Sequence, residues 1–428
     1  MPPRRLEPLR DAVELHVDGE RLRAARGEPL AVALVAAGRL VLGRSVKYHR
    51  PRGPVCFRGR CEGCLMRVDG RPNVTTCRAR VRAGIRVETQ NVVGRADADL
   101  LAATDWFFPE GMDHHHMFTR FRPVNELMQK VARRIAGVGT LPSEEIPPVA
   151  PRERDVDVLV VGAGPAGVAA SNAAAAAGAR VLVVDEELVP GGAARLRGLP
   201  VAPLGPPVER AFGTSLLGLW DEVGAGFSGG RREAHEEVRW YLAGNDSGVT
   251  RIRARGLVVA TGATPASLPL PGADRPGVFS AEGAWALLAH RVLPGDEVCI
   301  VYAGEEEAHA RALAGALTRA GAQARCWAEA EVQGFGGGAQ LSHLRAGAQD
   351  ERCDAAVLVG PASARYALAG QAGAAVRFTG GGFLVEADDD GRTASASTFA
   401  VGSATGRRGE DGVAQGARAG RLAAGARP

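Results

Sequence analysis

Three cysteines lie within nine residues of this chain, in the segment CFRGRCEGC at residues 56 to 64. A fourth completes the spacing Cys56-x4-Cys61-x2-Cys64-x12-Cys77, and the whole sequence has only seven cysteines. Four thiolates from one compact loop can bind a [2Fe–2S] cluster with two sulfurs on each iron, and C-x4-C-x2-C is the spacing of plant-type clusters. We therefore predict a [2Fe–2S] cluster bound by these four cysteines.

A structural zinc site and free thiols are the alternatives for this loop. Zinc loops usually pair two closely spaced knuckles, whereas Cys77 stands alone after twelve residues. The spacing therefore favours the cluster. The three remaining cysteines, Cys299, Cys326 and Cys353, are scattered among apolar neighbours, and we expect them to be ordinary core residues.

Four arginines crowd the cysteine loop, namely Arg50, Arg52, Arg58 and Arg60. Positive charge near a cluster favours its reduced form and raises its potential. A solvated basic face that docks a partner is the alternative, and the sequence leaves both interpretations open.

A second motif, Gly162-x-Gly164-x-x-Gly167, follows the apolar strand DVDVLVV and opens the helix of GAGPAGVAASNAAAAAG. In a βαβ unit the first glycine makes the tight turn, the second lets the backbone approach a pyrophosphate, and the third lets the helix pack against the strand. The helix N-terminus offers its free amides to the phosphates. We therefore predict a dinucleotide site, with Asp185 as first choice for the ribose.

Later segments favour FAD in this site. GLVVATGATP at 256–265 and TFAVGSATG at 398–406 are strands with glycine-rich ends, and a helix is expected to begin near Gly412. Segments of this kind return the chain to the flavin domain in two-nucleotide flavoproteins. The residues expected to bind the dinucleotide are Gly162, Gly164, Pro165, Ala166, Gly167, Asp185, Glu186, Gly192, Ala260, Thr261, Gly262, Gly402 and Ser403.

A second strand and helix, EVCIVYAGEEEAHARALAGALTRAG, begins near 297 but lacks an intact phosphate loop. Its turn reads Tyr302-Ala-Gly-Glu-Glu-Glu307, in which one glycine survives and three glutamates would repel a pyrophosphate. We interpret this segment as a retained scaffold domain that binds no NAD(P). Residues 191–197 read GGAARLR, without the paired cysteines of a disulfide reductase.

The domain organisation predicted from these patterns is α/β. A hairpin of ELHV and RLRA around Asp18-Gly19, a short helix and the cysteine loop fit an N-terminal β-grasp, ferredoxin-like domain at 10–95. A helical connector and proline-rich linker follow at 96–154. The Rossmann-like FAD domain is expected at 155–274 and 376–428, around the degenerate domain at 275–375.

Composition excludes several classes of protein. A net charge of +4 on 428 residues does not suggest a nucleic-acid surface, and no apolar run is long enough for a membrane span. The N-terminus has no apolar signal region, so we expect a cytoplasmic protein with reduced thiols. His114, His115 and His116 are interpreted as an interface segment, because three adjacent histidines cannot all face one metal ion.

Taken together, these motifs resemble the α subunits of heteromeric amine and amino-acid oxidoreductases. That group includes the sarcosine oxidase α subunit, dye-linked proline and hydroxyproline dehydrogenases, opine oxidases and hydrogen cyanide synthase. The resemblance covers nearly the whole chain, and the stretches SVKYHRPRG (45–53) and RPGVFSAEGAWALL (275–288) carry it strongly. It implies an iron–sulfur domain fused to a flavoprotein with two dinucleotide domains.

The resemblance also implies a partner. The amine would be oxidised in a D-amino-acid-oxidase-like β subunit with its own flavin, with FMN or FAD near the interface of a hetero-oligomer. Electrons would then pass through this chain's cofactors. The chain departs from the family in lacking room for a folate-binding C-terminal half, and in having Gly402-Ser403 where Gly-Asp is usual. Some relatives place NAD or ATP in the first Rossmann site, so those ligands stay open beside FAD.

Two other functions compete with this interpretation. A self-contained reductase would take hydride from NAD(P)H, which the damaged second loop argues against. A non-catalytic scaffold with a structural nucleotide would not need four well-spaced cysteines. The sequence identifies neither the amine, nor the final electron acceptor, nor the stoichiometry, nor the reduction potentials, and it supports no assignment of a catalytic residue.

Overall fold

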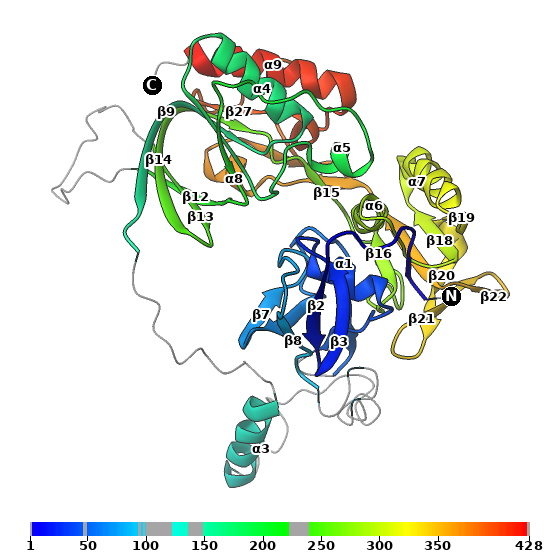
Figure 1. Ribbon diagram of the computed structural model, residues 1–428. Helices are drawn as coiled ribbons and strands as arrows, with labels where there is room; N and C mark the ends of the chain where they lie inside the picture. Colours follow the sequence, from blue (N-terminus) through cyan, green and yellow to red (C-terminus); the bar gives the residue numbers. More distant parts are fainter. Residues whose placement is uncertain are drawn as a thin grey trace. The chain divides into compact units, whose positions relative to one another are not determined.

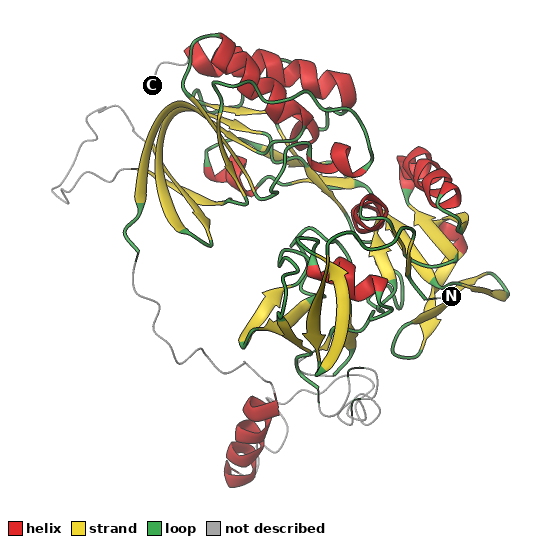
Figure 2. Cartoon of the chain, viewed as in Figure 1, coloured by secondary structure: helices red, strands yellow, loops and turns green. Residues whose placement is uncertain are grey.

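The computed structural model describes residues 2–45, 49–92, 96, 99, 122–135, 149–221 and 239–425 (Figures 1 and 2). Two compact units are present, each built from two stretches of sequence. One unit is Met1–Glu145 with Ser267–Gly360, and the other is Ile146–Ala266 with Pro361–Pro428. Within the described residues, no helix has the length and apolar character needed to cross a membrane.

The first unit begins with a mixed sheet whose strand order is β3-β2-β8-β6-β7. The predicted hairpin is confirmed, because β2 pairs antiparallel with β3 around Asp18 and Gly19, both at positive φ as a tight hairpin turn requires. β8 then inserts between the hairpin and β6, parallel to β2, which is the β-grasp arrangement. The elements are β2 (Ala12–Val17), β3 (Glu20–Ala25), α1 (Leu30–Ala36), β6 (Leu65–Val68), β7 (Arg71–Thr75) and β8 (Arg86–Glu88), with the short hairpin β4 (Gly43–Arg44) and β5 (Pro51–Arg52).

A parallel sheet of order β16-β23-β18-β19 forms the second part of this unit. Its elements are β16 (Val278–Ser280), α6 (Ala281–Ala289), β18 (Glu297–Tyr302), α7 (Glu307–Arg319), β19 (Gln323–Ala328) and β23 (Ala355–Val359), beside an antiparallel ribbon of β20 (Val332–Gly337), β21 (Leu341–Ala346) and β22 (Gln349–Arg352). The N-terminal strand β1 (Arg4–Arg5) pairs with β17 (Val292–Leu293). The chain's first residues therefore tie the β-grasp domain to this domain.

The second unit is organised around β9 (Arg152–Val161) and β14 (Gly248–Val259), which run parallel at the centre of a sheet of order β11-β10-β9-β14-β13-β12. The C-terminal strand β27 (Thr398–Ala400) pairs parallel with the last residues of β14, so the end of the chain returns to this sheet as predicted. The remaining strands are β10 (Val181–Asp185), β11 (Glu209–Phe212), β12 (Ser215–Asp221) and β13 (Arg239–Asn245).

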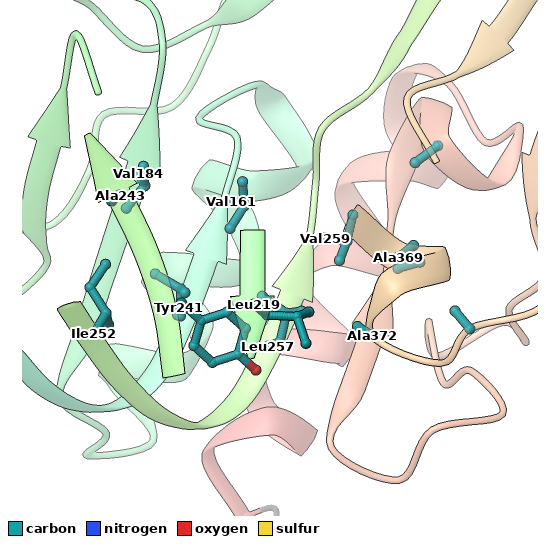
Figure 3. Packing of buried hydrophobic residues seen from close by; sticks show 14 of the residues in the cluster. Val161, Val184, Leu219, Tyr241, Ala243, Ile252, Leu257, Val259, Ala369 and Ala372 are labelled. Carbon is teal, nitrogen blue, oxygen red and sulfur yellow. The ribbon is translucent and has the colours of Figure 1, made fainter. Parts of the chain in front are cut away.

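Both faces of this sheet are covered, which explains the continuous apolar run of β9. Val158 and Val160 face α4 (Pro165–Ala176) and α9 (Gly409–Gly425), whereas Leu159 and Val161 point to the opposite face. There Tyr241 and its neighbours pack with α8 (Ala367–Gln371) (Figure 3). α9 and α4 approach closely because α9 presents glycines to the backbone of α4. A Cβ at Gly416 or Gly420 would lie 2.2 or 2.1 Å from a carbonyl oxygen of α4.

Some elements differ from the sequence-based expectation. α9 begins at Gly409 rather than near Gly412, and the segment 152–154, expected as linker, is already the start of β9. Cys299 and Cys353 are buried as expected, but Cys326 on β19 is only partly buried, so it is not a core residue. The expected connector helix is α3 (Arg122–Ile135), and the three adjacent histidines lie outside the described residues.

The smaller elements complete the description. They are α5 (Gly192–Leu196), β15 (Ala263–Pro265), β24 (Ala362–Ala364), β25 (Val376–Phe378), β26 (Phe383–Val385), and the 3-10 turns η2 (Gly304–Glu306), η3 (Glu329–Glu331) and η4 (Gly402–Thr405). The predicted α/β class, a β-grasp domain followed by two Rossmann-like domains, is confirmed by this topology. The domain limits expected from the sequence stay predictions.

Candidate functional site

The four cysteines of the loop come together in the first unit. Cys56 contacts both Cys61 and Cys77 through its thiol, and Cys77 also contacts Cys64. The thiols thus form a row, Cys61–Cys56–Cys77–Cys64, with one pair at each end. A two-iron cluster takes two thiolates on each iron, and these end pairs supply them.

Contacts among the four thiols shift their pKa values in opposite directions. Contact with Cys61 and Cys77 lowers the pKa of Cys56, and contact with Cys77 lowers the pKa of Cys64. The same contacts raise the pKa values of Cys61 and Cys77, because each of these thiols then keeps the shared proton. These contacts therefore favour the thiolate, which is the form that binds metal, at Cys56 and Cys64.

Backbone amides of the cysteine loop point at the sulfurs. The N–H groups of Arg58 and Arg60 donate to Sγ of Cys56 at 3.4 and 3.3 Å, and that of Gly59 donates to Sγ of Cys77 at 3.1 Å. Gly59 has φ +69°, a left-handed conformation that glycine adopts without strain. Amide donors of this kind stabilise charge on cluster sulfurs, so the loop fits a [2Fe–2S] cluster.

Zinc and a two-iron cluster differ in how they use four thiols. Structural zinc needs four ligands around a single centre. A row of paired thiols suits two irons better, and we propose Cys56, Cys61, Cys64 and Cys77 as the ligands.

The start of α6 contacts the backbone just before the cysteine loop. This part of α6 lies in the middle of the stretch 275–288. The backbone N–H of Ser280 donates to the carbonyl of Val55 at 3.1 Å, and the Ser280 hydroxyl caps α6 through the N–H of Gly283. A Cβ at Gly283 would lie 2.1 Å from the Val55 oxygen, so the helix touches the loop backbone directly. The rings of Phe57 and Phe279 pack at 6.1 Å between centroids.

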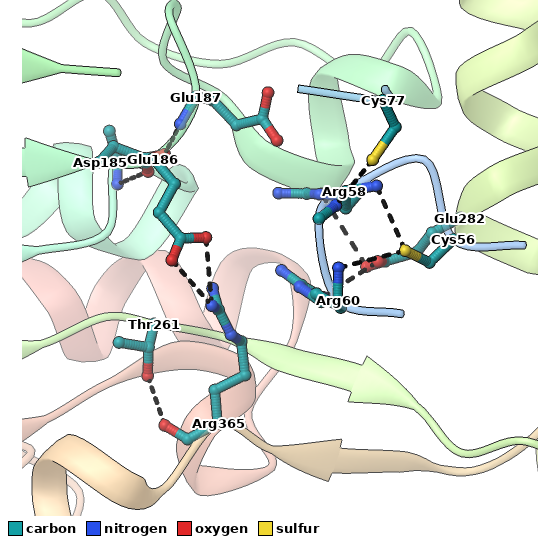
Figure 4. A network of polar contacts seen from close by, with 12 residues as sticks. Cys56, Arg58, Arg60, Cys77, Asp185, Glu186, Glu187, Thr261, Glu282 and Arg365 are labelled. Carbon is teal, nitrogen blue, oxygen red and sulfur yellow. Dashed lines mark hydrogen bonds and ion pairs between the residues drawn. The ribbon is translucent and has the colours of Figure 1, made fainter. Parts of the chain in front are cut away.

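Glu282 is a residue beside the cysteine loop that sequence reasoning missed. Its side chain is 6% exposed, and its carboxylate lies 3.1 Å from Nη1 of Arg60 and 3.9 Å from Nη1 of Arg58 (Figure 4). Arg52 pairs instead with Asp274 at an exposed position. The solvated basic face considered from the sequence is therefore wrong for Arg58 and Arg60, whose side chains are largely buried and share one carboxylate.

The glycine loop of the second unit has the geometry of a dinucleotide turn. Gly162 has φ +104°, and a Cβ there would lie 2.2 Å from the Ala260 oxygen. A Cβ at Gly167 would lie 1.9 Å from the Gly162 oxygen, so both of these glycines are required by the fold itself. At Gly164, which precedes α4, a Cβ would meet nothing within 4 Å. The open space at Gly164 is where the predicted pyrophosphate would approach.

The acidic residues after β10 are already bonded within the unit. The Asp185 carboxylate accepts the Ala163 N–H at 2.5 Å and the Glu187 N–H at 2.7 Å, which fixes the glycine turn to the end of β10. Glu186 pairs with Arg365 at 3.2 Å, and the Arg365 carbonyl accepts the Thr261 hydroxyl (Figure 4). The ribose role of Asp185 or Glu186 stays a prediction. Arg365 is an addition that the sequence did not suggest.

The other predicted dinucleotide residues gather around the same loop. Gly192, at the start of α5, has Gly164 Cα 3.5 Å from where its Cβ would be, and a Cβ at Gly402 would lie 2.8 Å from Ala166 Cβ. Gln415, fully buried on α9, accepts the Gly402 N–H at 3.0 Å and donates to the Asp388 carbonyl. An amide side chain thus anchors the turn at Gly402-Ser403, where the family has a carboxylate.

The second dinucleotide domain has a different turn. Beside this turn, Glu306 faces Nδ1 of His309 at 3.4 Å, and Trp285 Nε1 donates to Nε2 of His309 at 3.3 Å. Glu307, the first residue of α7, is bound to Arg311 one turn later. Side chains that follow β18 therefore pair within the domain itself, and the turn adds negative charge where a pyrophosphate would need positive partners.

Two known protein families match this chain, one at the cysteine loop and one at the glycine loop. Residues 10–92 match the 2Fe-2S iron-sulfur cluster binding domain, and residues 156–293 match the pyridine nucleotide-disulphide oxidoreductase domain. These matches confirm the two predicted cofactors, a [2Fe–2S] cluster and FAD.

Individual relatives agree with the family matches. The alpha subunit of sarcosine oxidase from Rhizobium meliloti (strain 1021) is 32% identical over 308 residues, which are 65% of this chain and 30% of that protein. An opine oxidase component of the same organism is 35% identical over 156 residues, 35% of this chain and 33% of that protein. The hydrogen cyanide synthase subunit HcnA of Pseudomonas aeruginosa is 37% identical over 87 residues, 20% of this chain and 83% of HcnA.

Among solved structures, L-proline dehydrogenase from P. horikoshii shares the fold. It aligns with 95% of this chain and 71% of its own, with a TM-score of 0.70 and 21% sequence identity. The aligned part of this chain covers less than a third of the sarcosine oxidase protein and about a third of the opine oxidase component.

Proposed function

Because this chain belongs to the group of iron–sulfur flavoprotein subunits that includes the sarcosine oxidase α subunits, the opine oxidase components and HcnA, we propose that it is an electron-transfer subunit of a heteromeric amine or amino-acid dehydrogenase. The substrate class we propose is a secondary amine or amino acid of the sarcosine, proline, hydroxyproline or opine type. The oxidised C–N bond would lie in a partner subunit of the D-amino-acid-oxidase type, in the cytoplasm, where thiols stay reduced.

One observation carries this proposal. The domain that would bind NAD(P)H in a self-contained reductase has its phosphate turn surrounded by Glu306, His309 and Trp285, while the start of its α6 supports the cysteine loop. The second dinucleotide domain thus keeps its fold but supports the cysteine loop. A chain that receives its electrons from another protein does not need that domain to bind a nicotinamide.

The chain's own residues have three tasks in this function. Cys56, Cys61, Cys64 and Cys77 would hold the cluster, and the glycine turn at Gly164 with the N-terminus of α4 would bind the pyrophosphate of FAD. Once bound, the cluster supplies one-electron chemistry and the flavin supplies one- and two-electron chemistry. The amides of residues 58–60 orient toward the sulfurs, and Glu282 of α6 holds the Arg60 side chain.

We expect the purified chain alone to be inert toward both amines and nicotinamides. Stopped-flow mixing of the oxidised, cofactor-loaded chain with NADH or NADPH should leave its visible flavin band unbleached on the time scale of catalysis, because no pyrophosphate cradle is available at the end of β18. Sodium dithionite, which needs no binding site, serves as the positive control and should reduce both cofactors.

Rapid bleaching by NADH or NADPH at a rate that saturates with nucleotide would contradict the proposed electron-transfer role. It would favour the self-contained reductase instead.

A further inference from the structure

Glu282 occupies an unusual position for a carboxylate. It lies in the first turn of α6, in the second dinucleotide domain, yet it is buried against the iron–sulfur loop of the same compact unit. Its partners are Arg60, at 3.1 Å, and Arg58, at 3.9 Å, whose side chains are only 14% and 10% exposed. One negative charge is thus shared by two largely buried positive charges.

The same two arginines also contact the predicted cluster ligand. Their backbone N–H groups donate to Sγ of Cys56, so each arginine links Glu282 on one side to the sulfur on the other. Holding the two arginine side chains in place limits how far the loop backbone that carries these amides can move. Hydrogen bonds to the sulfurs and net charge near the cluster are two of the factors that set its reduction potential.

The position of Glu282 is itself fixed. Ser280 caps α6 and also donates to Val55, directly before the loop, while Gly283 lets the helix approach the Val55 carbonyl. The carboxylate therefore lies on a rigid support, as a residue needs to if it is to orient others.

We propose that Glu282 is a positioning residue for the iron–sulfur centre, which holds Arg58 and Arg60 with their amides toward Cys56 and keeps the reduction potential lower than these two cations alone would set it. The inference rests on the proposed cluster ligation. It gives the degenerate dinucleotide domain a role in place of nucleotide binding, since that domain supplies the charge that tunes the centre.

The direction of the change in reduction potential follows from the net charge of Arg58, Arg60 and Glu282. The wild-type group of two arginines and one glutamate has one net positive charge, which becomes two in Glu282→Gln and zero in Arg60→Gln. Because reduction adds an electron to the cluster, Glu282→Gln should raise its midpoint potential and Arg60→Gln should lower it. The expected change is roughly tenfold in the ratio of reduced to oxidised cluster at fixed solution potential, or about 59 mV for a one-electron centre.

The experiment is an anaerobic potentiometric titration of the full chain, followed by electron paramagnetic resonance of the reduced cluster. Asp274→Asn is the matched control, because Asp274 also forms an arginine pair between these two domains, with Arg52, but both side chains are well exposed. Its potential should stay close to that of the wild type, since exposed pairs contribute little. The double variant Glu282→Gln/Arg60→Gln should return toward the wild-type value.

Opposite shifts in the two single variants support the proposal. Shifts in the same direction, or shifts no larger than that of Asp274→Asn, would overturn it. If Glu282→Gln does not retain its cluster, the sign of the Arg60→Gln shift decides alone, and an unchanged potential there would also overturn it. Iron, sulfide and FAD content of the wild type are measured first, so that a missing cluster is recognised as a failure of the proposed function and not of this inference.

Discussion

Serine at any one of Cys56, Cys61, Cys64 or Cys77 is expected to abolish or strongly destabilise the visible absorption of the cluster, with loss of both iron and acid-labile sulfide. The expectation follows from the row of thiols, in which Cys56 and Cys77 each contact two neighbours and the outer two each complete an end pair. A hydroxyl is a much poorer ligand for iron than a thiolate, so one replacement leaves one iron with a single protein sulfur.

The matched control is Cys326→Ser, which changes a partly buried thiol on β19, outside the loop. It should keep full iron and sulfide content when the proteins are made anaerobically with iron available. FAD content of all variants should be unchanged, because the glycine turn belongs to the other compact unit. Zinc without iron or sulfide in the wild type would contradict the ligand assignment.

Replacing Gly164 by valine is expected to remove the bound nucleotide while leaving the fold and the cluster intact. The backbone at Gly164 has φ −68° and ψ 176°, which any residue adopts, and a Cβ there meets nothing within 4 Å. The backbone therefore accepts a Cβ at this position without a clash. The two added methyl groups would instead fill the space that the pyrophosphate needs, so nucleotide content should fall to near zero.

A comparison with Gly167 shows why a substitution at Gly164 tests nucleotide binding rather than folding. A Cβ at Gly167 would lie 1.9 Å from a carbonyl oxygen, so Gly167→Val should destabilise the unit by more than the roughly 1–3 kcal/mol of ordinary overpacking. Gly425→Val, at the open end of α9, is the neutral control. Acid extraction and chromatography of the released nucleotide, with a thermal melt, separate these outcomes. Full nucleotide occupancy in Gly164→Val would show that the site lies elsewhere.

The parts of the fold that could be predicted from the sequence are those that depend on residues close together in the chain. The apolar run of β9, the glycine turn and α4 follow one another in sequence, so the βαβ unit is visible without knowledge of distant contacts. The turn at Asp18-Gly19 is equally local. The start of α9 is harder to place, because Gly409 and Gly412 both offer a plausible helix start to sequence inspection.

The same reasoning explains why the sequence predicted the four cysteines of the cluster site but not Glu282. The cysteines are close in sequence, and their spacing alone indicates iron–sulfur chemistry. Glu282 is separated from Arg60 by 222 positions, so no local pattern links them. The stretch 275–288 is characteristic in the sequence, but only the structure explains it, because Ser280, Glu282 and Gly283 are the residues that contact the loop.

At the dinucleotide site, too, the sequence did not predict contacts between distant residues. The ribose role of Asp185 is inferred from its place at the end of β10, but the structure shows its carboxylate bonded to two backbone amides. Arg365, which pairs with Glu186 across 179 positions of sequence, could not be inferred from either segment. Residues brought together by the sheet, rather than by the chain, remain hidden until the topology is known.

The central claim is that this chain carries electrons taken from an amine by another protein of the same complex. The most direct test is to purify the tagged chain with its bound flavoprotein partner, mix the complex anaerobically with sarcosine, proline, hydroxyproline or an opine, and freeze it for electron paramagnetic resonance. We expect one of these amines to produce the reduced-cluster signal, and the Cys64→Ser complex to give none. An amine that is turned over by the complex while the wild-type cluster stays oxidised throughout would contradict the account.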